Sequence, residues 1–279
     1  MKNMLPFDYR ISGYFRDCGK AGKKMAVTKE ILALAVETGD ALLRNGAEVY
    51  RVEDTVMHIL DAYEIENYDV YVLSNGIFAS ANEDRDDSCS MVRHVPLGST
   101  HLGRIAALNE LSREICSHEC SLQDAWVRLD HCKSIPCNRD IVQFFFCGLG
   151  SASFGYLFGG NLTDAVSAFA AGTLLQIFLN FLSRRKTSKF TKNILGSALV
   201  TMISLLAYSM EPGIQYDKVI IGAIMPLVPG IALTTSIRDL FNGDYLSGTI
   251  HMIDAVLTAF CIAVGVGAVI TLYRMGGAI

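Results

Sequence analysis

The residues best suited to chemistry lie where two prolines interrupt an apolar run late in the chain. The interruption reads Met-Pro-Leu-Val-Pro-Gly and contains Pro226, Pro229 and Gly230. Each proline lacks a backbone donor and clashes with the carbonyl four residues earlier, so we expect the carbonyls of Gly222 and Met225 to lose their helical partners. Lipid cannot satisfy such groups, and transporters use broken helices of this kind to bind solutes. The pattern predicts a substrate site at Pro226, Pro229 and Gly230. The ordinary alternative is a plain proline kink repaired by neighbouring helices.

Charged and hydroxyl side chains follow the interruption and are candidates for binding and coupling. Arg238 can hold a carboxylate through two parallel hydrogen bonds, and Thr234 adds a hydroxyl. Asp239, Asp244 and Asp254 can take up and release a coupling proton where they are partly buried. The alternative is a polar loop with mixed charges, and composition alone favours that loop.

Two amides lie earlier, inside another apolar run. The second apolar run carries Gln176 and Asn180, and both join the candidate substrate-binding set. Asp164, near the start of the same run, fits the ordinary role of an acid in the first turn of a helix.

Acid–base residues also occur in the charged first half of the chain. His58 follows Asp54 by four residues on a predicted helix, so the two side chains can pair and serve acid–base chemistry. A solvated helix face with ordinary pairs explains the same spacing better. The sequence holds no nucleophile elbow, no Walker A loop and no His-Glu-x-x-His motif. We therefore predict no catalytic residue.

Cysteine and histidine residues gather near the end of that half, which raises the question of a metal. Cys116 and Cys120 share a helix face with His118 between them, and His131 and Cys132 follow. No Cys-x-x-Cys pair accompanies them, as a structural zinc site usually requires. The eight cysteines also lack the spacing of a disulfide framework, which fits a reducing compartment. We predict neither a metal nor another cofactor.

These residues belong to two halves of different composition. The 279-residue chain is 51% hydrophobic and 19% charged, below the roughly 25% charged residues of an ordinary soluble domain. Charges are frequent up to residue 140, and long apolar runs follow. We expect a flexible or interfacial leader over 1–26, a domain over 27–135 and a transmembrane domain over 136–279. The leader has no apolar core, which excludes a secretory signal peptide and predicts that the first domain stays in the cytoplasm.

The period of the apolar residues predicts a small α+β domain in residues 27–135. A period near 3.6 predicts helices over 28–44, 47–63, 101–115 and 121–132, the first and last capped by Thr28 and Ser121. Alternation predicts strands over 68–73, 77–80 and 89–95, with polar residues 82–90 as a loop.

The apolar runs predict a bundle of about five transmembrane helices, so the fold class is a membrane protein with a small cytoplasmic α+β domain. The predicted spans cover about 141–158, 162–182, 194–210, 219–233 and 249–272. Prolines interrupt the fourth, and the polar loop 234–248 follows it. Gly148, Ser151 and Gly155 in the first span predict close helix packing.

Basic residues set the expected orientation in the membrane. Residues 183–192 contain five basic side chains and no acid, so this loop should face the cytoplasm. The loop separates the second and third spans, which places the segment before the first span in the cytoplasm as well. An odd number of spans then puts the C-terminus outside.

Three blocks of sequence carry a resemblance to a known family. They are Arg-Asn-Gly-Ala-Glu-Val-Tyr-Arg-Val-Glu at 44–53, Val-Leu-Ser-Asn-Gly-Ile-Phe-Ala-Ser at 72–80, and the Met225–Gly230 interruption leading into Arg238–Gly248. On these blocks the chain resembles the threonine/serine exporter family, including its split members of the succinate-exporter type. The resemblance covers nearly the whole chain after Val27, and the third block is long and specific.

The resemblance implies a secondary-active exporter of small polar metabolites that bear carboxylates, either threonine and serine or succinate. It implies coupling to the proton gradient, a bacterial inner-membrane location, and a second, smaller membrane unit that long family members carry at their C-terminus. The chain stops after its fifth predicted span, so we expect a separate small membrane subunit as partner, within a higher oligomer. The other expected partners are the lipid bilayer and the solute, and no nucleic acid. A membrane-anchored hydrolase and a sensor or scaffold acting through the N-terminal domain stay open as alternatives.

Overall fold

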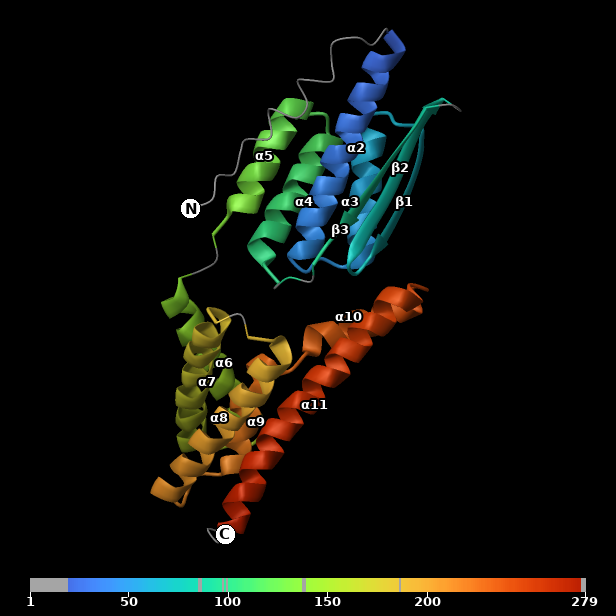
Figure 1. Cartoon of the computed structure of the whole chain (residues 1–279). Helices are drawn as coiled ribbons and strands as arrows, with labels where there is room; N and C mark the ends of the chain where they lie inside the picture. The colour runs from blue at the N-terminus through green and yellow to red at the C-terminus, as the bar shows by residue number, and fades with distance from the viewer. Residues whose placement is uncertain are drawn as a thin grey trace. The chain divides into compact units, whose positions relative to one another are not determined.

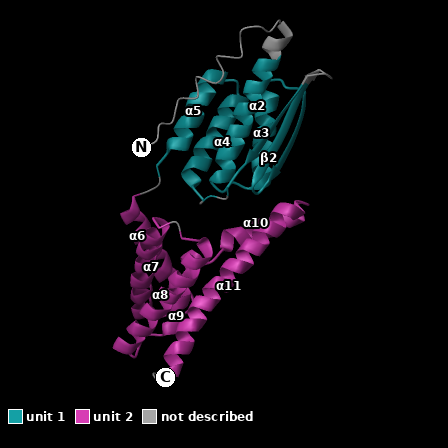
Figure 2. Ribbon diagram, viewed as in Figure 1, with its two compact units in different colours: residues 1–136 teal, residues 137–279 magenta. Residues whose placement is uncertain are grey.

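The computed structural model describes residues 20–84, 87–96, 98, 100–136, 139–185 and 187–276. Residues 1–19 of the predicted leader lie outside the described residues. The chain divides into two compact units, Met1–Pro136 (unit 1) and Cys137–Ile279 (unit 2) (Figure 2). The division falls where frequent charges give way to long apolar runs.

Unit 1 consists of an antiparallel sheet and two layers of helices (Figure 1). The sheet has the order β1-β2-β3, with β1 (Asn67–Leu73), β2 (Gly76–Asp84) and β3 (Asp87–His94). Helices α2 (Lys20–Arg44) and α3 (Val49–Ala62) pack against the sheet. Helices α4 (Leu102–Cys116) and α5 (Leu122–Ser134) pack on the other side of α2 and α3. The predicted α+β character is therefore confirmed.

The core of unit 1 lies between these layers. Leu32, Ile59, Ile77 and Leu108 are each fully buried and come from α2, α3, β2 and α4. A spacing of 3.6 residues in the helices and of two in the strands places the apolar side chains on one face of each element. Their burial is the main favourable contribution to the stability of the domain. Ser121 caps α5 as predicted, because its hydroxyl accepts a hydrogen bond from the backbone N–H of Asp124 at 3.2 Å.

Two boundaries in unit 1 differ from the prediction. Helix α2 begins at Lys20, so Thr28 is a buried residue inside the helix and the predicted cap at Thr28 is wrong. Much of 82–90 is strand rather than loop, since Asn82 pairs with Ser88 and Asp84 with Asp87. Cross-strand hydrogen bonds satisfy the backbone whatever the side chains are, so polar residues can extend a hairpin.

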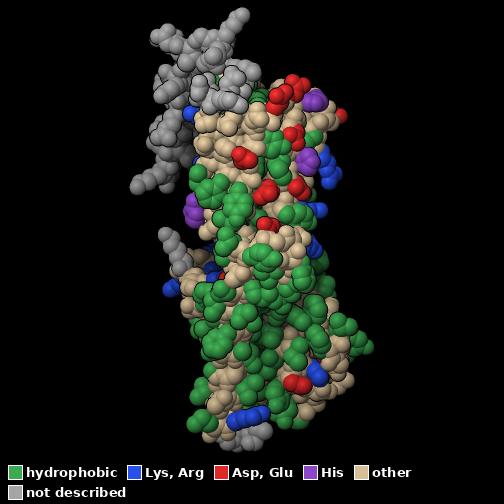
Figure 3. All heavy atoms as spheres, turned by 90° about the vertical axis from the view of Figure 1, so that its right-hand side faces the viewer, with side chains coloured by type: hydrophobic (Ala, Val, Ile, Leu, Met, Phe, Trp, Pro, Cys, Tyr) green, Lys and Arg blue, Asp and Glu red, His purple; other side chains and the backbone are tan. Residues whose placement is uncertain are grey.

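Unit 2 is helical in all its described regular elements. They are α6 (Asp140–Leu157), α7 (Leu162–Ser183), α8 (Lys189–Met210), α9 (Tyr216–Ile224), the 3₁₀ turn η1 (Met225–Leu227), α10 (Gly230–Phe241) and α11 (Tyr245–Met275). Hydrophobic side chains cover most of unit 2 on the face shown in Figure 3. Apolar side chains in contact with lipid require no protein partner, so this surface has membrane character.

Three described helices, α7, α8 and α11, are long and apolar enough to cross a membrane. The number is four if α9 with η1 and α10 together count as one bent span. Helix α6 is not among them, so the predicted count of five stays a prediction.

The polar segment 234–248 is helical on both sides of a short turn, so the prediction of a loop there is wrong. Helix α10 continues to Phe241, and α11 begins at Tyr245. Gly243 makes the turn with a φ of +93°. Side-chain polarity does not end a helix whose backbone remains satisfied, and the hydroxyl of Thr235 bonds back to the carbonyl of Ile231 at 2.9 Å.

Small residues allow helices α6, α7 and α9 to approach closely, as the sequence predicts. A Cβ on Gly222 of α9 would lie 2.6 Å from both the backbone N of Gly155 and the carbonyl oxygen of Ser151 on α6. A Cβ on Gly172 of α7 would lie 2.1 Å from the Ser151 hydroxyl. Backbone atoms cannot move aside cheaply, so these glycines fix the distance between the helices.

We expect Gly222→Ala to destabilise unit 2. The added methyl group meets backbone atoms of α6 and forces the helices apart, at a cost of about 1–3 kcal/mol. The melting temperature in detergent should fall by about 5 °C. The matched control is Gly150→Ala on α6, where an added Cβ meets nothing within 4 Å and alanine is the better helix former. A Gly222→Ala variant that melts no lower than the control would contradict this packing.

Candidate functional site

The break between α9 and α10 is the central feature of unit 2. Helix α9 ends at Ile224, η1 follows, and α10 begins at Gly230 with its axis bent by 58° from that of the preceding segment. Val228 between them is extended, with φ −63° and ψ 127°. The predicted interruption of the fourth apolar run is therefore present in this structure.

The carbonyls predicted to lose their partners are satisfied. The Gly222 carbonyl accepts a hydrogen bond from the N–H of Met225. The Met225 carbonyl accepts one from the N–H of Val228 at 3.1 Å. The prediction of free carbonyls is thus wrong, because the chain tightens into a 3₁₀ turn. In such a turn each carbonyl bonds to the N–H three residues later, so the N–H groups that the prolines lack are not needed.

Leu227 fills the inside of the break. Its side chain is 8% exposed and belongs to one apolar cluster with Leu175 of α7, Val200 of α8 and Ile262 of α11. Gly196 of α8 lies beside it, since a Cβ there would be in ordinary contact with a Leu227 methyl carbon at 3.5 Å. The break therefore lies against α6 as well as α7, α8 and α11, and the apolar Leu227 side chain fills the interior at that level.

Most predicted substrate residues of the break lie on its exposed side. Pro226, Gly230, Thr234 and Arg238 are exposed, while Pro229 is half-buried. The Thr234 hydroxyl donates to carbonyls of its own helix, with the Gly230 oxygen at 3.1 Å. These residues form one stretch of surface on η1 and α10 rather than a closed pocket.

The three candidate coupling aspartates fall into two places. Asp239 is 2% exposed on the face of α10 that packs against α11, and its carbonyl accepts a hydrogen bond from the N–H of Asp244 at 2.9 Å. Asp254 lies further along α11, about 14 Å from the start of the helix. It forms an ion pair with Lys189 of α8 at 2.5 Å. The structure therefore does not gather them into one cluster.

The two amides of α7 differ in their surroundings. The Asn180 side chain donates to Asp140 of α6 at 3.0 Å, and Arg184 lies 3.6 Å from the same carboxylate. Gln176 is half-buried and follows Leu175 of the Leu227 cluster. Asn180 thus belongs to a polar cluster where α6 begins and α7 ends.

Asp164 does more than the first-turn role expected from its position. It is fully buried. One carboxylate oxygen accepts from the N–H of Asn161 at 2.7 Å, and the other accepts from the N–H of Gln215 at 2.8 Å. Gln215 is the residue before α9, so Asp164 ties the beginning of α7 to the beginning of α9.

Sequence reasoning missed a polar pair, Asn193 and Thr258, beside the break. Helices α8 and α11 run in the same direction, because Lys189 meets Asp254 and, further on, Ser197 meets Gly265. Asn193 is one turn after Lys189, and Thr258 is one turn after Asp254, so both lie at the same level. They are 8% and 2% exposed. The Asn193 side-chain nitrogen and the Thr258 hydroxyl lack hydrogen-bond partners among the described residues.

This pair is one helical turn from the residues that contact Leu227. Gly196 and Ile262 pack around Leu227 and follow Asn193 and Thr258 by three and four residues. Buried polar groups are nearly always hydrogen-bonded, so unsatisfied ones call for a water or a ligand. The only sequence signal is one amide and one hydroxyl in separate apolar spans.

The candidate acid–base and metal residues of unit 1 form no site among the described residues. Asp54 and His58 are exposed on α3. The Cys116 thiol lies 3.7 Å from the His58 carbonyl oxygen, and no group of three or more His, Cys, Asp or Glu side chains could hold a metal ion in the part of the chain that is described. Burial and a hydrogen bond to Asp61 raise the pKa of Tyr68 to about 12.

A comparison with protein families gives the context of these features. A family model described as "Putative threonine/serine exporter" matches residues 33–273. The chain belongs to this threonine/serine exporter family. The match runs from α2 to α11 and so includes both units. The family predicted from three sequence blocks is confirmed.

Curated relatives of the chain include other members of the threonine/serine exporter family. The chain is 23% identical over 244 residues to the "Probable threonine/serine exporter" of Mycobacterium tuberculosis, covering 86% of this chain and 45% of that protein. It is 22% identical over 244 residues to the "Threonine/serine exporter" of Corynebacterium glutamicum, covering 85% and 50%. It is 23% identical over 257 residues to the "Probable succinate transporter subunit YjjP" of Klebsiella aerogenes, covering 89% and 96%.

The chain spans about half the length of the two exporters. These relatives are named as transporters rather than enzymes. No solved structure matches the chain.

Proposed function

We propose that the chain is a subunit of a secondary-active exporter of small polar metabolites that bear carboxylates, either threonine and serine or succinate. The observation that carries the proposal is the bent α9–α10 pair, which lies within the family-matched region and is closed on its inside by Leu227. Broken helices place solute sites inside transporters. The names of the relatives support the substrate class.

In this proposal the solute passes the Leu227 side of the break. Asn193 and Thr258 offer a buried donor and a hydroxyl one turn away, and Arg238 binds the carboxylate on the exposed side with Thr234 and Gly230. Pro226 and Pro229 keep the chain bent. Gln176 and Asn180 line the same bundle on α7. Movement of the Leu227 side chain would connect the buried side of the break, with Asn193 and Thr258, to the exposed side with Arg238.

We propose five spans, with unit 1 in the cytoplasm of a bacterium and unit 2 in its inner membrane. The span added to α7, α8, α11 and the bent α9–α10 pair is α6, the first in the chain. Its 18 residues extend about 27 Å, close to the roughly 30 Å thickness of the hydrocarbon layer. Its Ile141, Phe146 and Leu157 are exposed, as a lipid-facing surface requires. Basic Arg184, Arg185 and the residues around Lys189 support a cytoplasmic loop between α7 and α8.

We propose a separate small membrane subunit as partner. The relative from Klebsiella aerogenes, of which this chain covers 96%, is named a transporter subunit. The two exporters are about twice as long as the region that this chain matches, so each carries additional sequence in the same chain. A second membrane unit supplied in trans fits both facts.

Proton coupling is assigned to Asp239. A residue that carries a proton through a transport cycle must be shielded from bulk water, and Asp239 is the most buried of the three candidate acids, while Asp244 and Asp254 are half-buried. Asp239→Asn should reduce export driven by a pH gradient about tenfold and leave exchange of labelled for unlabelled solute intact, because exchange needs no net proton movement.

The control for this prediction is Asp217→Asn, which removes an acid that is 56% exposed in the first turn of α9. It should change neither activity. If Asp239→Asn keeps full gradient-driven export, or loses exchange and export together, the coupling role is wrong.

Metabolite profiling tests the proposed function in cells. A strain deleted for this gene is compared with one that overexpresses it together with its chromosomal neighbours. We expect one carboxylate metabolite to accumulate inside the deletion strain and outside the overexpressing strain. No such compound in either strain would contradict an export function.

A further inference from the structure

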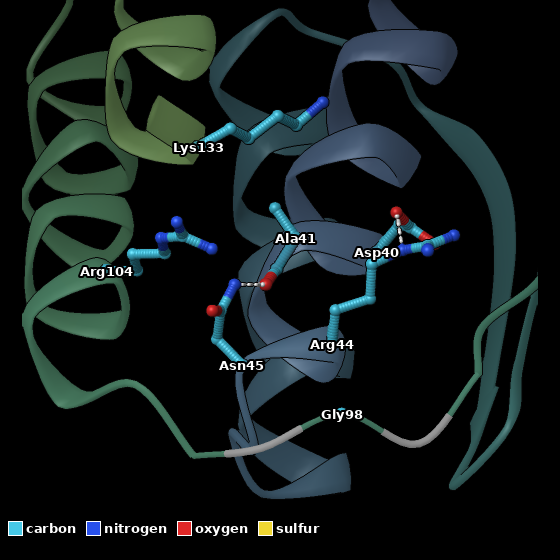
Figure 4. A pocket seen from close by; sticks show the side chains of 7 residues that line it. All are labelled: Asp40, Ala41, Arg44, Asn45, Gly98, Arg104 and Lys133. Carbon is cyan, nitrogen blue, oxygen red and sulfur yellow. Dashed lines mark hydrogen bonds and ion pairs between the residues drawn. The ribbon is translucent and has the colours of Figure 1, made fainter. Parts of the chain in front are cut away.

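A positively charged pocket of about 410 Å³ lies within unit 1 (Figure 4). It is formed by the last turns of α2, the beginning of α4 and the end of α5. Arg104 and Lys133 extend toward α2 from α4 and α5, while Asp40 and Arg44 lie on α2 itself. Pockets that bind small molecules have volumes of about 300–1,000 Å³, so this one can enclose a small metabolite.

The charges that line the pocket do not cancel. Arg44, Arg104 and Lys133 are opposed within the lining by Asp40 alone. One oxygen of Asp40 accepts a hydrogen bond from Arg44 Nε at 2.6 Å, and the other, Oδ1, is buried without a partner among the described residues. Glu37, just outside the lining, pairs with Lys133 at 2.8 Å, so three cations face two carboxylates. The pocket therefore has a surplus of one positive charge and attracts an anion.

Arg104 is the cation best placed to bind that anion. Its Nε donates to the carbonyl of Ile135 at 2.8 Å, which anchors the guanidinium and leaves its two terminal nitrogens for another acceptor. Arg104 has no ion-pair partner among the residues that the structure describes. A planar guanidinium held in this way matches the two oxygens of a carboxylate.

Lys133 adds a second, partly shielded charge. Its ammonium lies 2.8 Å from Glu37, and Glu37 is shared with Arg93. Burial lowers the pKa of Lys133 because the ammonium loses part of its hydration. A bound anion would restore the electrostatic stabilisation that water no longer provides.

We propose that unit 1 binds a small carboxylate-bearing metabolite in this pocket, with Arg104 and Lys133 holding the carboxylate. The chemistry of the site rests on residues of unit 1 alone, so the proposal stands whether or not the chain transports. Occupancy would make unit 1 a ligand-sensing part of the protein.

Trp126 supplies a local probe for the test. It is the single tryptophan of the chain and lies on α5, seven residues before Lys133 and thus on the same face of that helix. The full-length protein in detergent is titrated with succinate, with threonine and with inorganic phosphate while Trp126 fluorescence is recorded. Equilibrium dialysis with the labelled compounds gives the number of sites independently of fluorescence.

We expect saturable binding of at least one of the two carboxylates. Arg104→Gln and Lys133→Gln should each weaken it about tenfold, because each removes a charged hydrogen-bond donor. Arg113→Gln is the matched control, since Arg113 is an exposed cation on the same helix α4 and does not line the pocket. Unchanged melting temperatures show that both pocket variants fold.

Three results would overturn the proposal. The first is no binding of either carboxylate by dialysis. The second is binding that both pocket variants retain at full affinity and stoichiometry. The third is binding of phosphate alone, which would make the pocket a phosphate site. If Arg104→Gln fails to fold, Lys133→Gln decides between these outcomes.

Discussion

Replacing both prolines of the break, Pro226→Ala with Pro229→Ala, should give a protein that still folds but exports at least about tenfold more slowly. Proline costs about 3 kcal/mol more than alanine inside a helix, and each alanine restores a backbone donor. Residues from Tyr216 to Phe241 could then form one continuous helix without the 58° bend. Straightening would move α10 away from α11 and withdraw Leu227 from its cluster.

The measurement pairs the melting temperature in detergent with solute efflux from proteoliposomes. We expect the variant to keep a cooperative melting transition, with efflux at least about tenfold lower, since a misplaced binding geometry alone costs that much. Pro212→Ala is the control, because Pro212 lies in the turn between α8 and α9 rather than at the break. A stable double variant with normal efflux would show that the bend plays no part in transport.

Removing the polar pair beside the break should also separate stability from activity. Asn193→Leu with Thr258→Val keeps the branching pattern of the two buried side chains and removes the two groups that lack partners among the described residues. A buried polar group without a partner costs about 1–3 kcal/mol. The double variant should therefore melt at the same or a higher temperature. If the pair binds the solute or its water, efflux should fall about tenfold or more.

Thr201→Val is the matched control for this prediction. Thr201 is a fully buried threonine on α8, and its hydroxyl donates to the carbonyl of Ser197 at 2.8 Å, within its own helix. Loss of the Thr201 hydroxyl should leave efflux within about twofold of the unmodified protein, because that hydroxyl already has a partner in its own helix. Normal efflux in the Asn193 and Thr258 double variant would exclude the pair from the transport path.

The sequence predicts most helices and strands of both units because the spacing of apolar residues differs between the two kinds of element. Alternation in 68–73 and the 3.6-residue period around Leu108 and Leu129 indicate the strands and helices that the structure contains. The start of α2 was not predictable in this way, since its first turn is rich in lysine and lacks an apolar stripe. This first turn of α2 is helical because it extends the part of the helix that packs into the core after it.

The candidate site was predictable only where the signal is local. Pro226 and Pro229 mark the break from sequence alone, because proline acts on its own backbone. The 3₁₀ repair at Met225 and Val228 depends on how the chain tightens between two helices, which residue type does not specify. Asn193 and Thr258 become a pair only when α8 and α11 pack in register. No spacing along the chain relates residues 65 positions apart.

Efflux from proteoliposomes shows directly whether this chain with its partner moves a carboxylate metabolite across a membrane. Vesicles loaded with labelled threonine, serine or succinate receive the purified chain alone, the chain with the small partner subunit, or no protein. We expect at least one solute to leave faster with both proteins than from empty vesicles, and faster still with a proton gradient. If none of the three leaves faster than from empty vesicles while both proteins are folded and inserted, the proposed export function is wrong.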